Sequence, residues 1–118
     1  MAGTREDATM MIQLAQWGSA MGLGEATQTI WSDDFDPETA DARDEAVSKI
    51  LNWNETIGTL VKNGLLDRDL VYDWLWVEGV WAKVGPAALR AREASGVAAL
   101  YENFEALAAG QRLAAGVT

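Results

Sequence analysis

Residues 70–84 read LVYDWLWVEGVWAKV, and this stretch decides the fold. Apolar side chains occur there in nearly every direction around a helix, whereas a helix on the surface of a protein keeps one polar side. The stretch therefore predicts a helix that is buried on most sides, with Asp67 as its N-terminal cap. Such a helix lies either at the centre of a helical bundle or in a contact between two molecules.

Capping signals on the N-terminal side of this stretch predict three further helices. Thr4, with Asp7 three residues later, predicts a capping box at the start of a first helix that ends near Met21. A short second helix is expected at 25–31. The pair Asp36-Pro37 suits the cap and first position of the longest helix, at about 37–63.

Stop signals on the C-terminal side complete the predicted fold. Gly85-Pro86 is expected to end the central helix and to start a fifth helix that runs to about Ser95. A sixth helix is expected at 97–109, and the tail 110–118 should fray because it has little to bury. The prediction is thus one all-α domain over 1–109, a compact bundle of five to six helices.

Composition excludes several classes of chemistry. The chain has no His and no Cys, which removes the usual general base, the usual metal ligands and the cysteine nucleophile. We therefore expect no catalytic residue, no cofactor and no metal. Of the net charge of −9, residues 1–59 carry −8, with 11 acidic and 3 basic side chains. Such a surface repels polyanions, so we expect no direct contact with nucleic acid.

The hydropathy of the chain predicts no membrane insertion. No stretch approaches 18 uncharged apolar residues, and the N-terminus MAGTREDAT is acidic where a signal peptide would be basic. We expect a cytoplasmic location, or a membrane-proximal one if the chain is cut from a longer anchored protein.

The carboxylates have structural explanations that outweigh catalytic or metal-binding ones. A calcium-loop register begins at Asp34, but its sixth position is Thr39 where such a loop needs Gly. Asp73 and Glu78 lie about 140° apart around a helix and cannot act on one substrate atom. We expect Asp73 at a surface edge and Glu78 as a buried polar group.

Two polar groups within apolar stretches are candidates for burial. Glu78 is expected to pair with one of the nearby cations, Lys83, Arg90 or Arg92. Asn54 interrupts the apolar stripe of its helix. It could fix the register of an interface, as a single buried Asn does in coiled coils, or bond to the backbone of a neighbouring helix.

Six Trp are many for 118 residues, and Trp is frequent at the energetic centres of interfaces. In a continuous central helix Trp74 and Trp81 share one face, while Trp76 points about 200° away from Trp74. If the first two face the core, Trp76 is left for a partner, and Tyr72 and Val80 join it as candidate partner contacts.

The segments NGLLDRDLVYDWLW at 63–76 and LYENFEALA at 100–108 resemble a family of uncharacterised bacterial helical domains. The resemblance covers about residues 40–109. It implies an all-α fold, a bacterial origin and a role near the membrane, because many members carry one or two membrane-spanning helices upstream. No catalytic residues are established for that family, so the resemblance implies none here.

Three functions are compatible with these observations. The first is a non-enzymatic module that binds an unknown protein partner and forms a homo-oligomer. The second is a small acidic inhibitor that mimics nucleic acid, which requires a continuous exposed stripe of carboxylates from Asp33 to Glu45. The third is a helical pocket for an apolar small molecule, which requires a cavity.

Overall fold

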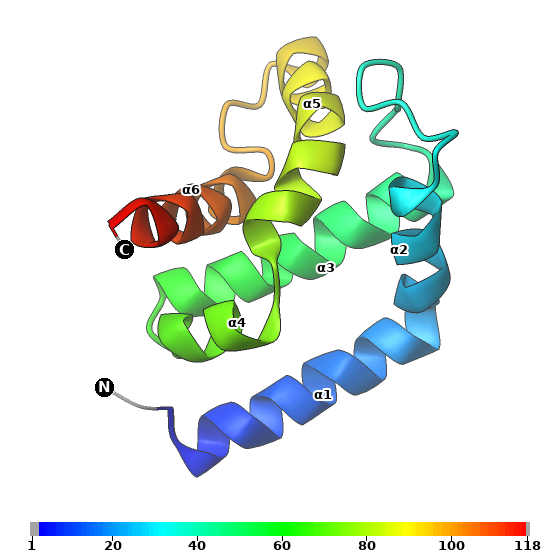
Figure 1. The fold of residues 1–118 in the computed structure, drawn as a ribbon. Coiled ribbons are helices and arrows are strands. Elements are labelled where there is room, and N and C mark those ends of the chain that lie inside the picture. Colours follow the sequence, from blue (N-terminus) through cyan, green and yellow to red (C-terminus); the bar gives the residue numbers. More distant parts are fainter. Residues whose placement is uncertain (1–2, 118) are drawn as a thin grey trace.

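The computed structural model describes residues 3–117, and these form six α-helices and no strand (Figure 1). The all-α prediction is confirmed, with six helices. In chain order they are α1 (Arg5–Met21), α2 (Leu23–Trp31), α3 (Glu45–Lys62), α4 (Arg68–Trp74), α5 (Val77–Ser95) and α6 (Glu102–Val117).

The helix α1 begins and ends where the sequence predicts. The Thr4 hydroxyl accepts a hydrogen bond from the Asp7 backbone N–H, and the Asp7 carboxylate accepts one from the Thr4 N–H, which forms the capping box. Gly22 then adopts a left-handed φ of 83°, which glycine tolerates without strain, and the chain turns directly into α2.

The predicted long helix 37–63 is wrong in its first part. Residues 36–44 form turns, and α3 begins only at Glu45. Asp36 caps a single turn, because its side chain accepts a hydrogen bond from the Glu38 N–H and its carbonyl accepts one from Ala40. The longest helix is therefore α5, with 19 residues, and not the predicted segment.

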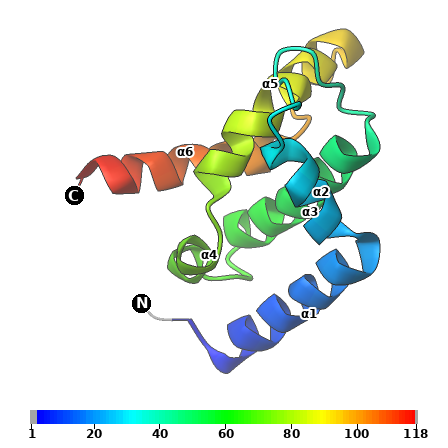
Figure 2. The same cartoon turned by 45° about the vertical axis from the view of Figure 1, so that its right-hand side comes forward.

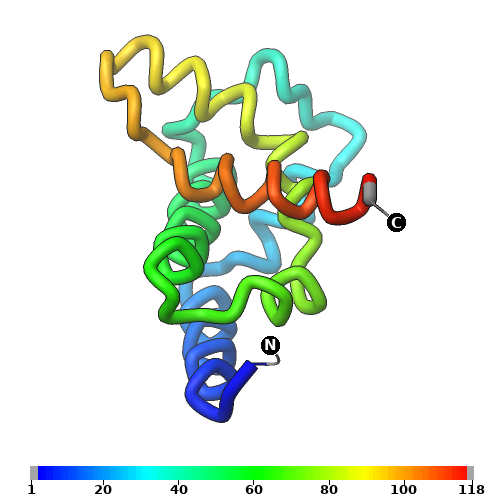
Figure 3. The backbone as a smooth tube through the Cα atoms, turned by 90° about the vertical axis from the view of Figure 1, so that its left-hand side faces the viewer, coloured from blue at the N-terminus to red at the C-terminus, as the bar shows by residue number. Residues whose placement is uncertain are grey.

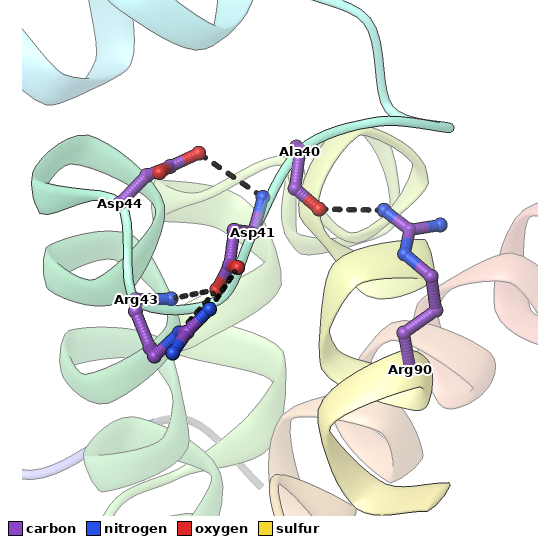
Figure 4. Close-up of polar contacts among 5 residues, drawn as sticks. All are labelled: Ala40, Asp41, Arg43, Asp44 and Arg90. Atoms are coloured by element: carbon purple, nitrogen blue, oxygen red, sulfur yellow. Dashed lines mark hydrogen bonds and ion pairs between the residues drawn. The ribbon is translucent and has the colours of Figure 1, made fainter. Parts of the chain in front are cut away.

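The loop formed by 36–44 is held from inside and from a distant helix (Figure 4). The Asp41 carboxylate accepts hydrogen bonds from the backbone and the side chain of Arg43, and the Asp44 carboxylate accepts one from the Asp41 N–H. From α5, the Arg90 guanidinium donates to the Pro37 and Ala40 carbonyls at 2.8 and 2.6 Å. The side-chain bonds replace the backbone bonds that a helix would supply.

The predicted central helix is broken at a different place from the one expected. The chain leaves the helical conformation at Leu75 and Trp76, and α5 then continues through Pro86 to Ser95. Gln111 of α6 stabilises this break: its side-chain N–H donates to the Leu75 carbonyl, and its side-chain oxygen accepts from the Glu78 N–H, each at 2.8 Å. Both backbone groups would otherwise lack a helical partner.

The helix α3 is at the centre of the molecule and packs mainly against α2 and α6, while α5 packs mainly against α6. Figure 3 shows α6 crossing over α3, and Figure 2 shows α1 on the outside, joined to the rest through α2. The side chains that are fully buried come from α2 to α6 and include Ile30, Leu51, Ile57, Val71, Val77, Val84 and Phe104.

At the junction between α3 and α6 the backbones of the two helices come close together. A Cβ atom on Gly58 would lie 2.5 Å from the Asn103 carbonyl oxygen, so only glycine admits the start of α6 there. Beside it the Glu55 carboxylate accepts hydrogen bonds from the Phe104 N–H and the Asn103 side chain, each at 2.9 Å. Glu55 thereby satisfies one of the free N–H groups at the N-terminus of α6.

The sixth helix differs from its prediction at both ends. It begins at Glu102 instead of 97 and extends to Val117, beyond the predicted limit of 109, so most of the predicted tail 110–118 is helical. Tyr101, with φ of 59°, directly precedes it. Thr118 lies outside the described residues.

Candidate functional site

An apolar pocket of about 320 Å³ lies where α1, α2 and α3 meet the α4–α5 break. Its apolar aliphatic lining comes from all of these elements: Ala15, Leu23, Ile50, Leu75, Val77 and Val80. Three indole rings, those of Trp53, Trp74 and Trp76, complete the apolar wall. We call this cavity the tryptophan pocket.

Two of its tryptophans are held by the core. Trp53 is 4% exposed, and its indole N–H donates to the Leu14 carbonyl of α1 at 2.9 Å. Its ring meets that of Trp74 edge to face, with centroids 5.6 Å apart. This is a favourable geometry for aromatic pairs, so these two walls are fixed before anything binds.

The third tryptophan is at the surface. Trp76 is 63% exposed and stacks on Trp31 of α2, with ring centroids 5.6 Å apart and planes 7° from parallel. A Cβ atom on residue 79 would overlap the fused ring atoms of Trp76, so Gly79 is what lets this indole lie against α5. The Lys83 ammonium lies 5.3 Å from the Trp31 ring centroid. Each ring of the exposed pair therefore has a second neighbour besides the other ring: Gly79 for Trp76 and Lys83 for Trp31.

The polar side-chain groups of the pocket are few, and two of them donate to backbone carbonyls of their own helices. Asn54 donates to the Ile50 carbonyl at 2.9 Å, and the Thr27 hydroxyl donates to the Leu23 carbonyl at 2.8 Å. No ionisable side chain lines the pocket in the part of the chain that the structure describes.

The structure separates the three residues predicted as partner contacts. Trp76 and Val80 both line the tryptophan pocket. Tyr72 lies elsewhere, because its hydroxyl donates to the Leu107 carbonyl of α6 and its ring lines an open groove between α4 and α6. Burial raises the pKa of the Tyr72 phenol. The face predicted for Trp74 and Trp81 is also wrong, because the break places them on different helices, and Trp81 packs edge to face against Phe104.

The two predicted buried polar residues differ in outcome. Asn54 is buried, at 5% exposure, but its amide donates to backbone one turn earlier in its own helix and not to the expected neighbouring helix. Glu78 is only half-buried, and none of the predicted cations pairs with it within residues 3–117. Arg90 is bound to the 36–44 loop and Arg92 to Glu105 at 3.1 Å, since each finds carbonyl or carboxylate oxygens nearer.

The acidic segment does not form the uninterrupted stripe that nucleic-acid mimicry requires. Asp33, Asp34, Asp36 and Glu38 are exposed. However, Arg43 lies on Asp41, and Arg90 is inserted against the same loop (Figure 4). Hydrogen bonds from the Arg43 side chain, and then from its backbone N–H, lower the pKa of Asp41 to about 2. Two guanidinium groups thus divide the row of carboxylates.

Two further findings describe the remaining surface. Within residues 3–117 no three acidic side chains are grouped so that they could hold a metal ion. In the same range, none of the helices combines the length and the apolar character that crossing a bilayer requires.

These features define an all-α domain of six helices, as far as the described residues go, with an apolar pocket beside an exposed tryptophan pair. The chain belongs to the family described as Domain of unknown function (DUF4760), which matches residues 1–111. No curated protein and no solved structure matches the chain. The resemblance to an uncharacterised helical family is confirmed, and the match extends further toward the N-terminus than the expected 40–109.

Proposed function

We propose that this domain is a non-enzymatic interaction module that associates with a second copy of itself through the stacked Trp31–Trp76 pair. The observation that carries the proposal is the exposure of two ordered indole rings, 41% for Trp31 and 63% for Trp76. Trp residues dominate the binding energy of protein interfaces. Rings that are already fixed by stacking lose little conformational freedom when a partner covers them.

Most of the predicted apolar segment 70–84 does not need a second molecule to cover it. The rest of the apolar segment 70–84 is largely covered by its own chain: Val71, Val77 and Val84 are fully buried. A second copy would therefore cover only the surface around Trp76, and not a whole apolar helix as the sequence suggested.

Charges around the pair suit a two-fold contact. Lys83 lies beside Trp31, and the exposed acids Asp33 and Asp34 follow Trp31 in the chain. A two-fold axis presents the same patch twice, so the lysine of one copy can face the acids of the other. The net charge of −9 on each copy opposes association, and salt screens this repulsion.

Sedimentation velocity at about 100 µM protein tests the proposal, in about 0.1 and 0.5 M NaCl. We expect a dimer at both salt concentrations, because burial of the indole rings carries the contact. Trp76→Ala should weaken it about 30-fold, the effect of losing an interface residue worth about 2 kcal/mol. Trp17→Ala is the matched control, because Trp17 is also 41% exposed and lies outside the pair. A mass of one chain at both salt concentrations would refute self-association.

The proposal also includes the cellular location of the domain. We place the module in the cytoplasm, which a fluorescent fusion of the full-length protein tests by its distribution between cell interior and envelope. Nucleic-acid mimicry has less support, because Arg43 and Arg90 divide the acidic row.

A further inference from the structure

We propose that the tryptophan pocket binds one neutral, largely apolar small molecule that carries a hydrogen-bond acceptor. This inference rests on the cavity and does not require a second copy of the chain. The volume of about 320 Å³ equals the space of about ten water molecules in the liquid. It is at the small end of ligand pockets, so a molecule of about ten non-hydrogen atoms is the expected size.

The lining determines that the ligand is apolar. Six aliphatic side chains and three indole rings face the cavity from α1 to α5. Water in such a cavity finds few hydrogen-bond partners, because the only polar side-chain groups of its described lining are the Asn54 amide, the Thr27 hydroxyl and the indole N–H groups. An apolar molecule that displaces this water gains affinity from the exchange.

The absence of ionisable groups from the lining determines that the ligand is neutral. A carboxylate or an ammonium entering the pocket would lose its hydration and meet no opposite charge among the described lining residues. The Lys83 ammonium lies at the Trp31 ring, and Trp31 is not part of the lining.

Unused donors determine the one polar feature of the ligand. An indole N–H can only donate a hydrogen bond. Trp53 uses its N–H on the Leu14 carbonyl, whereas the N–H groups of Trp74 and Trp76 donate to no group of the described residues, and that of Trp74 is open to solvent. A carbonyl, ether or hydroxyl oxygen on the ligand can accept from these N–H groups in place of water.

Three probes of equal size separate these requirements: acetophenone, isopropylbenzene and benzoate each have about nine non-hydrogen atoms, within the expected range. Acetophenone is neutral with one acceptor, isopropylbenzene is neutral with none, and benzoate is charged. Small ligands of this size bind with a Kd of about 1 µM to 1 mM when they fit. We expect acetophenone in that range, isopropylbenzene about 2–10-fold weaker for the lost hydrogen bond, and benzoate at least about 30-fold weaker.

Binding is followed by the indole N–H signals of ¹⁵N-labelled protein in NMR titrations, assigned through single Trp→Phe variants. Acetophenone should shift the signals of Trp74 and Trp76 saturably and leave that of Trp17 unchanged. The proposal is overturned if no signal shifts saturably up to about 5 mM, well above the expected Kd range, or if all tryptophan signals shift alike. Equal binding of benzoate would overturn the neutral class, and equal binding of isopropylbenzene would overturn the acceptor.

A pair of variants links the binding to this cavity. Ala15 is an exposed residue of α1 that lines the pocket, so Ala15→Phe fills the opening without changing the buried core. Ala20→Phe is the control, because Ala20 is exposed on the same helix and lies outside the lining. We expect at least a tenfold loss of acetophenone affinity in the first variant only. Equal affinity in both variants, with unchanged melting temperatures, would place the probe elsewhere and overturn the proposal.

Discussion

Substituting Gly58 by Ala should disrupt the junction between α3 and α6. The new Cβ would lie 2.5 Å from the Asn103 carbonyl oxygen and 3.0 Å from the Phe104 nitrogen, and both are backbone atoms that cannot rotate away. The start of α6 must therefore move. Such overpacking costs about 1–3 kcal/mol. The movement also lengthens the 2.9 Å bond from the Phe104 N–H to Glu55, and a bond to a charged group contributes about 1.5–3 kcal/mol.

A favourable term reduces this cost but does not cancel it. Alanine is better than glycine inside a helix by about 1 kcal/mol. The expected net result is a loss of about 1.5–5 kcal/mol in the free energy of unfolding, which lowers the midpoint of urea denaturation by about 1–3 M. Gly24→Ala in α2 is the control: a Cβ there meets no atom within 4 Å, so this variant should be unchanged or slightly more stable. If Gly58→Ala were as stable as the control, the close approach of α3 and α6 would be refuted.

Three other variants test separate features. Gly79→Ala should displace the exposed indole of Trp76 and abolish the exciton signal of the stacked pair in circular dichroism, while stability changes by less than about 1 kcal/mol; a retained exciton signal would contradict the packing. Arg43→Ala should raise the pKa of Asp41 from about 2 toward 3.8, measured by ¹³C NMR of the carboxyl group. Because folding depresses this pKa, the contribution of ionised Asp41 to stability is present above pH 3.8 and is lost as the pH falls through about 2. An unchanged pKa of Asp41 in the variant would show that the Arg43 side chain does not cause the depression. Pro86→Ala should stabilise the protein against urea by about 1–2 kcal/mol, since it restores a backbone donor inside α5, and a loss of stability would contradict this.

Sequence signals predicted the helix starts correctly where the capping hydrogen bonds join residues that are near one another in the chain. Thr4 and Asp7 form the predicted capping box, and the predicted Asp67 cap accepts a hydrogen bond from the Leu70 N–H. The pattern at Asp36-Pro37 is equally typical of a helix start. There the outcome depends on Arg90, whose guanidinium binds carbonyls of the loop from 50 or more residues away.

The pocket could be predicted only in part. The sequence singled out Trp76 and Val80, and both line it. Its shape depends on the break at Leu75, which no glycine or proline marks and which is stabilised by a side chain of α6. At Pro86 the reverse holds: a strong local stop signal lies inside a helix that is packed on α6. In both cases tertiary contacts outweigh the local preference of the residues.

Gln111 gives the end of the chain an influence on the pocket that its sequence position does not suggest. Its side chain binds the Leu75 carbonyl, at the break between α4 and α5, and the Glu78 N–H, in the first turn of α5, at the same time. If the last turns of α6 open, the break between α4 and α5 that carries Trp76 therefore loses this support. In hydrogen-exchange terms, we expect the Glu78 amide and the C-terminal half of α6 to open as one cooperative unit. A molecule bound in the pocket should slow exchange at both places, although neither Glu78 nor α6 lines it.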